Sequence, residues 1–220
     1  MKRSEVNAIQ REAKEFLAKH AWSLPPWAYW QPSDWKGRGS EIDEIKECML
    51  GWDVTDFGSG DFQRRGLFLF TLRNGNLGGK SKKQYAEKIM IVKVDQETPM
   101  HFHRNKMEDI INRGGGELCI QLYRSTSDEK LSEEDLAVSI DGISRTIPAG
   151  TTVTLHVGES ICLEPYMYHR FWAENGTCLV GEVSLVNDDT TDNRFLEDVG
   201  RFPAIEEDES ALHLLASDYR

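Results

Sequence analysis

Two histidines one residue apart, followed by a glutamate, form the sequence pattern that best fits a catalytic or binding centre. Residues 101–108 read HFHRNKME. On a strand, side chains at i and i+2 point to the same face, so His101 and His103 converge as two imidazoles sharing a metal must. Four residues separate His103 from Glu108, enough for a short turn that brings a carboxylate back. Imidazole plus carboxylate predicts a divalent ion of the Mn, Fe, Co, Ni or Zn group.

A third imidazole is needed to complete such a site. His20 ends an expected helix, where an exposed position near the last carbonyls is a sufficient role. His213 lies in the C-terminal tail, and His156 ends a strand without distinguishing neighbours. His169 lies in PYMYHRFWAENGT, where a proline and two tyrosines precede a strand. We therefore predict His169 as the remaining histidine ligand.

An Asn-Gly pair suggests a second carboxylate beside His169. If Asn175-Gly176 is a two-residue hairpin turn, Glu182 lies directly opposite His169. Directly opposed residues share a face of the sheet, with Cβ atoms about 4.5–5.5 Å apart. An unpaired buried carboxylate is unfavourable, so Glu182 would have a chemical reason to be there. The alternative is that Gly181 forms a bulge, which would turn Glu182 outward.

Three further residues are weaker candidates. Glu87 and Lys88 are neighbours on an expected strand, so one faces inward and one outward, and the spacing does not decide which. Lys88 is the candidate to stabilise oxygen charge or to shuttle a hydroxyl proton. Asp192 and Arg194 lie in a polar segment after the expected site strands, where they could hold distal substrate hydroxyls. Polar loops of this kind are also commonly just solvated.

The elements that position these residues are mostly short strands. Strand-like runs separated by turn signals recur about every 8–12 residues through the middle of the chain, which predicts an all-β barrel or sandwich. Asp141-Gly142 and Asn175-Gly176 are the strongest hairpin signals. Helical spacing predicts a first helix from Ser4 and a second over residues 40–50. We expect one domain over residues 1–220: a helical arm over 1–51, a barrel over about 52–186, and a C-terminal loop with a short helix over 187–220.

Composition excludes several classes of protein. The 220 residues carry 37 acidic and 26 basic side chains, a net charge of −11, which disfavours nucleic acid and anionic lipid as partners. No apolar run is long enough to span a membrane, and the N-terminus lacks the apolar core of a secretory signal. The four cysteines contain no C-x-x-C pair, which favours reduced thiols and a cytoplasmic protein.

The histidine-rich segment resembles the first motif of the cupin superfamily. The match consists of the His-x-His pair, Glu108 after four residues and Gly115 after six more, with Pro165 and His169 standing in for the second motif. More specifically, the run EKIMIVKVDQETPMHFHRNKMEDIINRGGGELCIQLY, together with EVSLVNDDTTDNRF, is similar to the D-lyxose ketol-isomerase family. That similarity covers most of the chain, including the N-terminal arm.

The resemblance implies a cupin-type jelly-roll barrel, a divalent metal with Mn²⁺ favoured over Zn²⁺, Co²⁺ or Fe²⁺, and a homodimer. The implied reaction interconverts D-lyxose and D-xylulose, and also D-mannose and D-fructose. The family's metal ligands carry over to His101, His103, Glu108 and His169. For this reaction Glu182 is our candidate base, although a metal-assisted hydride shift would need none. An Fe²⁺-dependent cupin dioxygenase and a non-catalytic sugar-binding module are the alternative functions.

Overall fold

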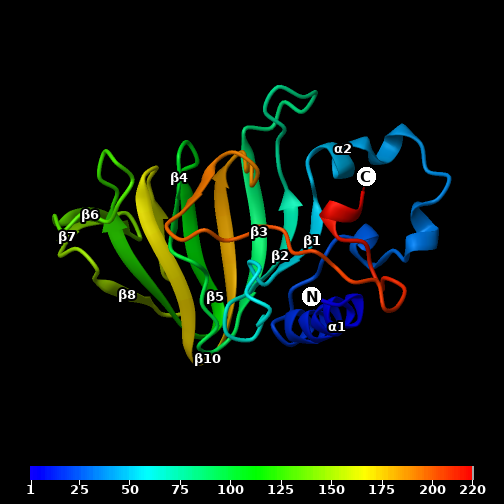
Figure 1. Cartoon of the computed structure of the whole chain (residues 1–220), viewed down its shortest axis with the longest axis horizontal. Helices are drawn as coiled ribbons and strands as arrows, with labels where there is room; N and C mark the ends of the chain where they lie inside the picture. The colour runs from blue at the N-terminus through cyan, green and yellow to red at the C-terminus, as the bar shows by residue number, and fades with distance from the viewer. Residues whose placement is uncertain (220) are drawn as a thin grey trace.

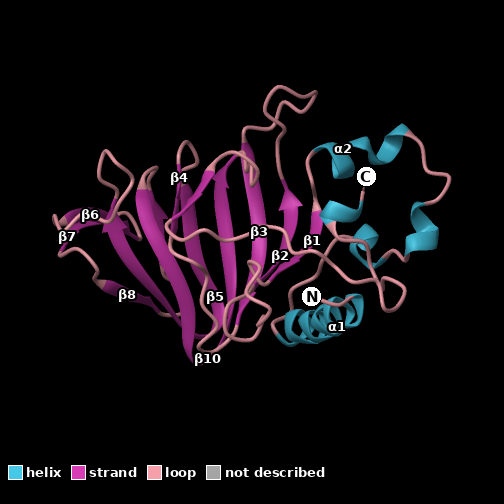
Figure 2. Cartoon of the chain, viewed as in Figure 1, coloured by secondary structure: helices cyan, strands magenta, loops and turns pink. Residues whose placement is uncertain are grey.

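The computed structural model describes residues 1–219, and antiparallel strands dominate it. The strands are β1 (Gly51–Thr55), β2 (Leu67–Arg73), β3 (Tyr85–Val92), β4 (His101–His103), β5 (Glu108–Arg124), β6 (Leu136–Ile140), β7 (Ile143–Ile147), β8 (Thr152–Leu155), β9 (Ser160–Leu163), β10 (Met167–Leu185) and β11 (Asn193–Phe195). The helices are α1 (Arg3–Lys19) and α2 (Asp43–Glu47), with 3₁₀ turns η1 (Pro26–Tyr29), η2 (Pro32–Trp35), η3 (Ser40–Ile42) and η4 (Ala216–Asp218). Figure 2 shows the helices gathered at one end of the molecule and the strands filling the rest.

The strands form one continuous antiparallel sheet. Its order is β1-β2-β3-β10-β5-β9-β6-β7, while β4 and β11 join through β10, and β8 pairs with β5. Apolar side chains of the central strands make the barrel interior, including Met90, Ile110, Leu118, Ile120 and Phe171. The prediction of an all-β, cupin-type barrel with an N-terminal helical arm is confirmed.

Two long strands, β5 and β10, carry most of this architecture. They pair with each other along nearly their whole length, and β10 runs down to its label in Figure 1 and then returns upward. The pairing is irregular at the bend, between Glu174 and Cys178. A Cβ on Gly115 would lie 2.0 Å from the Thr177 carbonyl oxygen, so the close approach of the two strands there requires glycine.

The two Asn/Asp-Gly signals have different outcomes. Asp141-Gly142 forms the expected two-residue turn, with Ile140 paired to Ile143 across it. Asn175-Gly176 does not close a hairpin, because both halves of β10 pair with β5 instead of with each other. The predicted pairing of His169 with Glu182 is therefore wrong.

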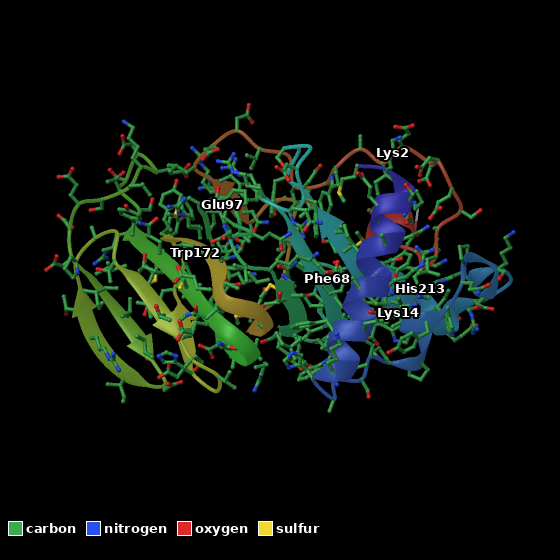
Figure 3. The ribbon with its side chains drawn as sticks, turned by 90° about the horizontal axis from the view of Figure 1, so that it is seen from below. Lys2, Lys14, Phe68, Glu97, Trp172 and His213 are labelled. Carbon is green, nitrogen blue, oxygen red and sulfur yellow. The ribbon has the colours of Figure 1, made fainter. Side chains whose placement is uncertain are left out.

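The helical arm covers the outer face of the barrel. Val6, Ile9, Ala13 and Leu17 of α1 pack in one cluster with apolar residues of β1, β2 and β3, among them Phe68. Figure 3 shows Phe68 beside α1. The second helix is shorter than expected, since the segment from Ser40 begins as η3 and becomes α-helical only over α2. No described helix combines the length and the apolar character needed to cross a bilayer.

The C-terminal tail runs along the polar side of α1. Arg3 pairs with Glu207 and with Asp218, at 2.6 and 3.0 Å. Further along the helix, the Lys14 ammonium lies 3.1 Å from Nε2 of His213, and Figure 3 shows these two side chains next to each other. The tail therefore fastens the arm to the barrel.

Candidate active site

Three imidazoles meet inside one end of the barrel. His101 and His103 lie on β4, and His169 lies on β10 directly paired with His101. One ring nitrogen from each histidine lies within 4.8 Å of those of the other two. The alternation of side chains along β4 explains the convergence of the first two rings, and the pairing of β4 with β10 supplies the third.

Backbone carbonyls fix the orientation of two of these rings. His101 Nδ1 lies 2.8 Å from the Pro99 carbonyl oxygen, and His169 Nδ1 lies 2.9 Å from that of Met167. Because a carbonyl oxygen only accepts hydrogen bonds, each Nδ1 carries the proton and each Nε2 keeps its lone pair. His169 Nε2 is buried without a hydrogen-bond partner. Histidines that ligate a metal through Nε2 are held in this way.

Glu108, at the start of β5, adds a carboxylate to the three rings. Its Oε1 atom lies 3.3 Å from Nε2 of both His103 and His169. Burial alone would raise the pKa of Glu108, but the nearby Lys106 ammonium lowers it well below its usual range. Burial also lowers the pKa of both His101 and His103. The site therefore combines neutral imidazoles with an ionised carboxylate.

This donor set fits a divalent transition metal. Unprotonated imidazole nitrogens and one carboxylate are ligands that Mn, Fe, Co, Ni and Zn accept, whereas Mg and Ca prefer oxygen alone. The unpartnered Nε2 of His169 supports the same interpretation, because a buried polar atom without a partner is unfavourable unless a ligand satisfies it.

A second carboxylate and two lysines lie beside the imidazole cluster. Lys106 Nζ lies 2.6 Å from Glu108 Oε2 and 2.9 Å from Glu182 Oε1. Lys88 Nζ lies 3.1 Å from the same Glu182 oxygen. Both ammoniums also donate to Oδ1 of Asn187, at 2.6 Å from Lys88 and 3.2 Å from Lys106. Glu182, Asn187 and the two lysines therefore form one network of contacts, and Glu108 connects this network to the histidines.

The structure places the Lys88 side chain inside the barrel and the Glu87 side chain on the outer surface. The Lys88 side chain is 4% exposed and lines the cavity together with Glu182, whereas Glu87 pairs with Arg73 at the surface. Glu182 faces Lys88 on the adjacent strand β3. Its inward position arises from this strand pairing and from the bend of β10.

Asp192 and Arg194 are occupied elsewhere. The Asp192 carboxylate accepts hydrogen bonds from the backbone N–H groups of Asn105 and Lys106, at 2.8 and 3.1 Å. Arg194 Nε donates to Glu129 at 2.8 Å. Within residues 1–219, neither side chain lines the histidine cavity. Asp192 thus holds the loop between His103 and Glu108, and its Oδ2 atom lies 3.9 Å from Nδ1 of His103. The binding of distal hydroxyls by Asp192 and Arg194 stays a prediction.

Comparison with known proteins assigns the family. Residues 1–219 match the family described as D-lyxose isomerase. The chain is 49% identical to a D-lyxose/D-mannose isomerase of Serratia proteamaculans, over 100% of this chain and 98% of that protein. It is 48% identical to a D-lyxose/D-mannose isomerase of Escherichia coli O157:H7, over 100% and 99% of the two chains. The chain belongs to the D-lyxose isomerase family.

Solved structures of sugar isomerases share the fold of this isomerase. An L-ribose isomerase of Cellulomonas parahominis with L-ribose aligns with a TM-score of 0.61 at 16% identity, over 94% of this chain and 98% of that one. The L-ribose isomerase of Geodermatophilus obscurus aligns with a TM-score of 0.62 over the same shares. At this identity the likeness establishes the fold, while the family match establishes an aldose–ketose isomerase.

Several cavity residues of the isomerase carry no signal in the sequence. Lys106 lies between His103 and Glu108, where a lysine in a turn would ordinarily be exposed, yet its side chain is 3% exposed. Asn187 and Arg201 follow β10 in irregular segments without any spacing motif. A buried cluster of carboxylates does require cations nearby, and that requirement is the one signal that could have pointed to Lys106.

Proposed function

We propose that this isomerase interconverts D-lyxose with D-xylulose, and D-mannose with D-fructose, using a divalent metal held by His101, His103, Glu108 and His169. The observation that carries the proposal is the Lys106 ammonium, which contacts both Glu108 and Glu182. The Lys106 side chain connects the Glu182 carboxylate, which is capable of proton transfer, to Glu108 among the proposed metal ligands. The printed substrates of the curated relatives support the choice of sugars.

Aldose–ketose isomerisation moves one hydrogen between C1 and C2 while the carbonyl moves the other way. A divalent ion, which we propose to be Mn²⁺, would supply Lewis-acid polarisation of the carbonyl. Glu182 takes the proton from C2 of the aldose and returns it to C1, so that O1 gains a proton and O2 loses one. Lys88 and Lys106 donate to Glu182 and stabilise negative charge on the substrate oxygens.

Apolar side chains form part of the cavity wall. Leu69, Met90, Ile110 and Phe171 line the same cavity as the ionisable groups. In such surroundings the interactions of charged groups are stronger than in water. The Fe²⁺ dioxygenase alternative is less well supported, because an O₂ pocket needs no pair of lysines on a second carboxylate.

The direct test is an anaerobic assay of the Mn²⁺-loaded protein with D-lyxose, following D-xylulose formation. Ketose formation without O₂ supports the proposal. Binding of D-lyxose without turnover would instead favour the sugar-binding module, and turnover that requires O₂ and Fe²⁺ would favour the dioxygenase.

A second measurement separates proton transfer from a hydride shift. The reaction is run in D₂O, and deuterium at C1 of the D-xylulose is measured by mass spectrometry. Proton transfer through Glu182 exchanges with solvent and incorporates deuterium, because a carboxylic acid proton exchanges during the lifetime of the intermediate. Absence of deuterium from the product would favour the hydride shift.

We also propose a homodimer in the cytoplasm. The family resemblance supports this assembly, and the four cysteines remain free thiols, as expected in a reducing compartment. Sedimentation of the purified protein tests the assembly, with a monomer at micromolar concentration as the contrary result.

A further inference from the structure

Two hollows lie next to each other over the sheet face that carries Lys88. The inner one, around His101, His103 and Glu182, has a volume of about 40 Å³. The outer one has a volume of about 190 Å³ and is lined by polar groups such as Asn74. Asp189 lines both hollows, so a single layer of side chains separates them.

An ion-paired arginine forms this dividing layer. Nη2 of Arg201 lies 2.5 Å from Asp53 Oδ2 and 3.1 Å from Asp189 Oδ2. Arg201 lines the inner hollow and Asp53 lines the outer one, so the ion pair crosses the wall. The Arg201 side chain is only 9% exposed, and two charged partners in fixed positions hold it there.

Arg201 and its acidic partners lie at one end of the inner hollow, next to the two lysines. Successive contacts lead from the histidines to Glu108, then to Lys106 and from there to Glu182. Asn187 contacts the ammoniums of both lysines and lies beside Asp189, which the charges of Lys88 and Lys106 also reach. Arg201, which contacts Asp189, thus forms the part of the cavity wall next to Asn187 and the lysines.

The inner hollow leaves little free volume beside this wall. A buried water occupies at least about 10–15 Å³ on the same measure, so the hollow holds about three waters. Additional room lies directly behind Arg201, in the outer hollow.

We propose that Arg201 is a specificity-determining residue, whose side chain forms the end wall of the sugar site and limits the length of aldose that the site accepts. The inference rests on the proposed function, which puts C1 and C2 at the histidines and therefore the far end of the sugar at Arg201. D-Lyxose and D-mannose share their configuration at C2, C3 and C4, and D-mannose has one more carbon at that far end. Comparing the activity on D-mannose with the activity on D-lyxose therefore shows whether Arg201 limits the length of the site.

The test compares two truncations of the same arginine. Arg201→Ala removes the wall and joins the hollows, so we expect the ratio of kcat/KM for D-mannose to that for D-lyxose to rise about tenfold, the effect of roughly one carbon in a pocket. Arg201→Met removes the same ion pairs but keeps a long side chain, so its ratio should stay near that of the wild type. Equal ratios in Arg201→Ala and the wild type would overturn the proposal, as would an equal rise in both variants.

Arg3→Ala provides a matched control. Arg3 is another buried arginine with two acidic partners, Glu207 and Asp218, but it lies on α1 and lines neither hollow. We expect this variant to lose stability while its substrate ratio stays unchanged. A shift of the ratio in Arg3→Ala would mean that general loosening, not wall removal, changes specificity, and would count against the proposal.

Two additions keep the test decisive. If Arg201→Ala fails to fold because Asp189 is left unpaired, the double variant Arg201→Ala/Asp189→Asn removes the wall without leaving that charge. Calorimetric Kd values for both sugars give the same ratio independently of turnover. If the wild type converts neither sugar, the proposed function fails, while the binding ratio still decides the role of Arg201.

Discussion

Lys106 is the side chain that connects the metal-binding donors with the candidate base. Its ammonium contacts Glu108 on one side and Glu182 on the other. Burial alone would lower the pKa of Lys106, but the two carboxylates raise it, so the side chain remains a cation. One buried positive charge therefore lies between two buried carboxylates.

The first prediction at this scale concerns the metal. His103→Ala removes one of the converging imidazoles, so we expect bound metal to fall well below one ion per chain when measured by elemental analysis after dialysis. His156→Ala is the control, because the His156 side chain is 65% exposed and lies outside the cavity. Full occupancy in His103→Ala would contradict the assigned ligand set.

A second prediction concerns proton transfer. Glu182→Gln keeps the shape of the side chain but removes its basicity, so we expect kcat to fall about 10²- to 10⁴-fold while metal content stays at the wild-type level. Steady-state kinetics with D-lyxose and elemental analysis measure the two effects. Glu174→Gln, on an exposed stretch of the same strand, should leave both unchanged. Near-normal turnover in Glu182→Gln would remove Glu182 as the base.

The sequence predicts some of these residues better than others. His101 and His103 follow from the geometry of a single strand, because side chains two apart share a face whatever the rest of the fold does. Lys106 and Arg201 depend on which distant carboxylates surround them. Such neighbours are determined by tertiary packing, and no local spacing encodes them.

At the scale of elements, the bend shared by β5 and β10 positions the site. His169 lies on one half of β10 and Glu182 on the other, an odd number of residues apart, so an unbroken strand would turn them to opposite faces. The irregular pairing near Asn175-Gly176 shifts the register and lets both line the interior. The sequence indicates a turn here, but a local motif cannot specify the strand with which each half pairs.

The corresponding prediction compares two glycines with positive φ. Gly115 (φ 91°) lies at the bend, and a Cβ there would clash with the Thr177 carbonyl, whereas Gly142 (φ 77°) has no atom within 4 Å of that position. Gly142→Ala should lower the free energy of unfolding by about 1 kcal/mol, because alanine is strained at a positive φ but meets no neighbouring atom. Gly115→Ala should cost at least about 3 kcal/mol, because the two strands must also separate. Urea denaturation measures both, and equal losses would show that the close approach is unimportant.

At the scale of the whole molecule, the tail packs against α1, and His213 of the tail lies between α1 and β1. His213, 4% exposed, stacks on Trp52 with ring centroids 5.5 Å apart. Its Nδ1 donates to the Trp30 carbonyl oxygen, so Nε2 accepts from Lys14. Burial lowers the pKa of both Lys14 and His213, and the Lys14 charge further lowers that of His213.

This arrangement predicts a pH dependence of stability. The folded state disfavours protonated His213, so its contribution is fully present above the ordinary pKa of 6.5 and decreases as the pH falls below that value. Between pH 8 and pH 5.5 the metal-free wild type should therefore lose more unfolding free energy than His213→Gln, because the glutamine does not titrate. Urea denaturation of both proteins in chelator gives this difference, and the other five histidines are common to both proteins. Parallel losses would exclude His213 as the titrating group.

The course of β10 makes the enzyme more sensitive to changes in chain length than to changes in side-chain type. Deleting one residue between Phe171 and Val180 would reverse the in–out alternation of one half of the strand relative to the other. Either His169 or Glu182 would then face solvent, and the proposed metal site would be separated from the proposed base although both side chains are still present. Insertions in the exposed connections between strands would have no such effect, so redesign of this scaffold should vary those connections and leave the length of β10 untouched.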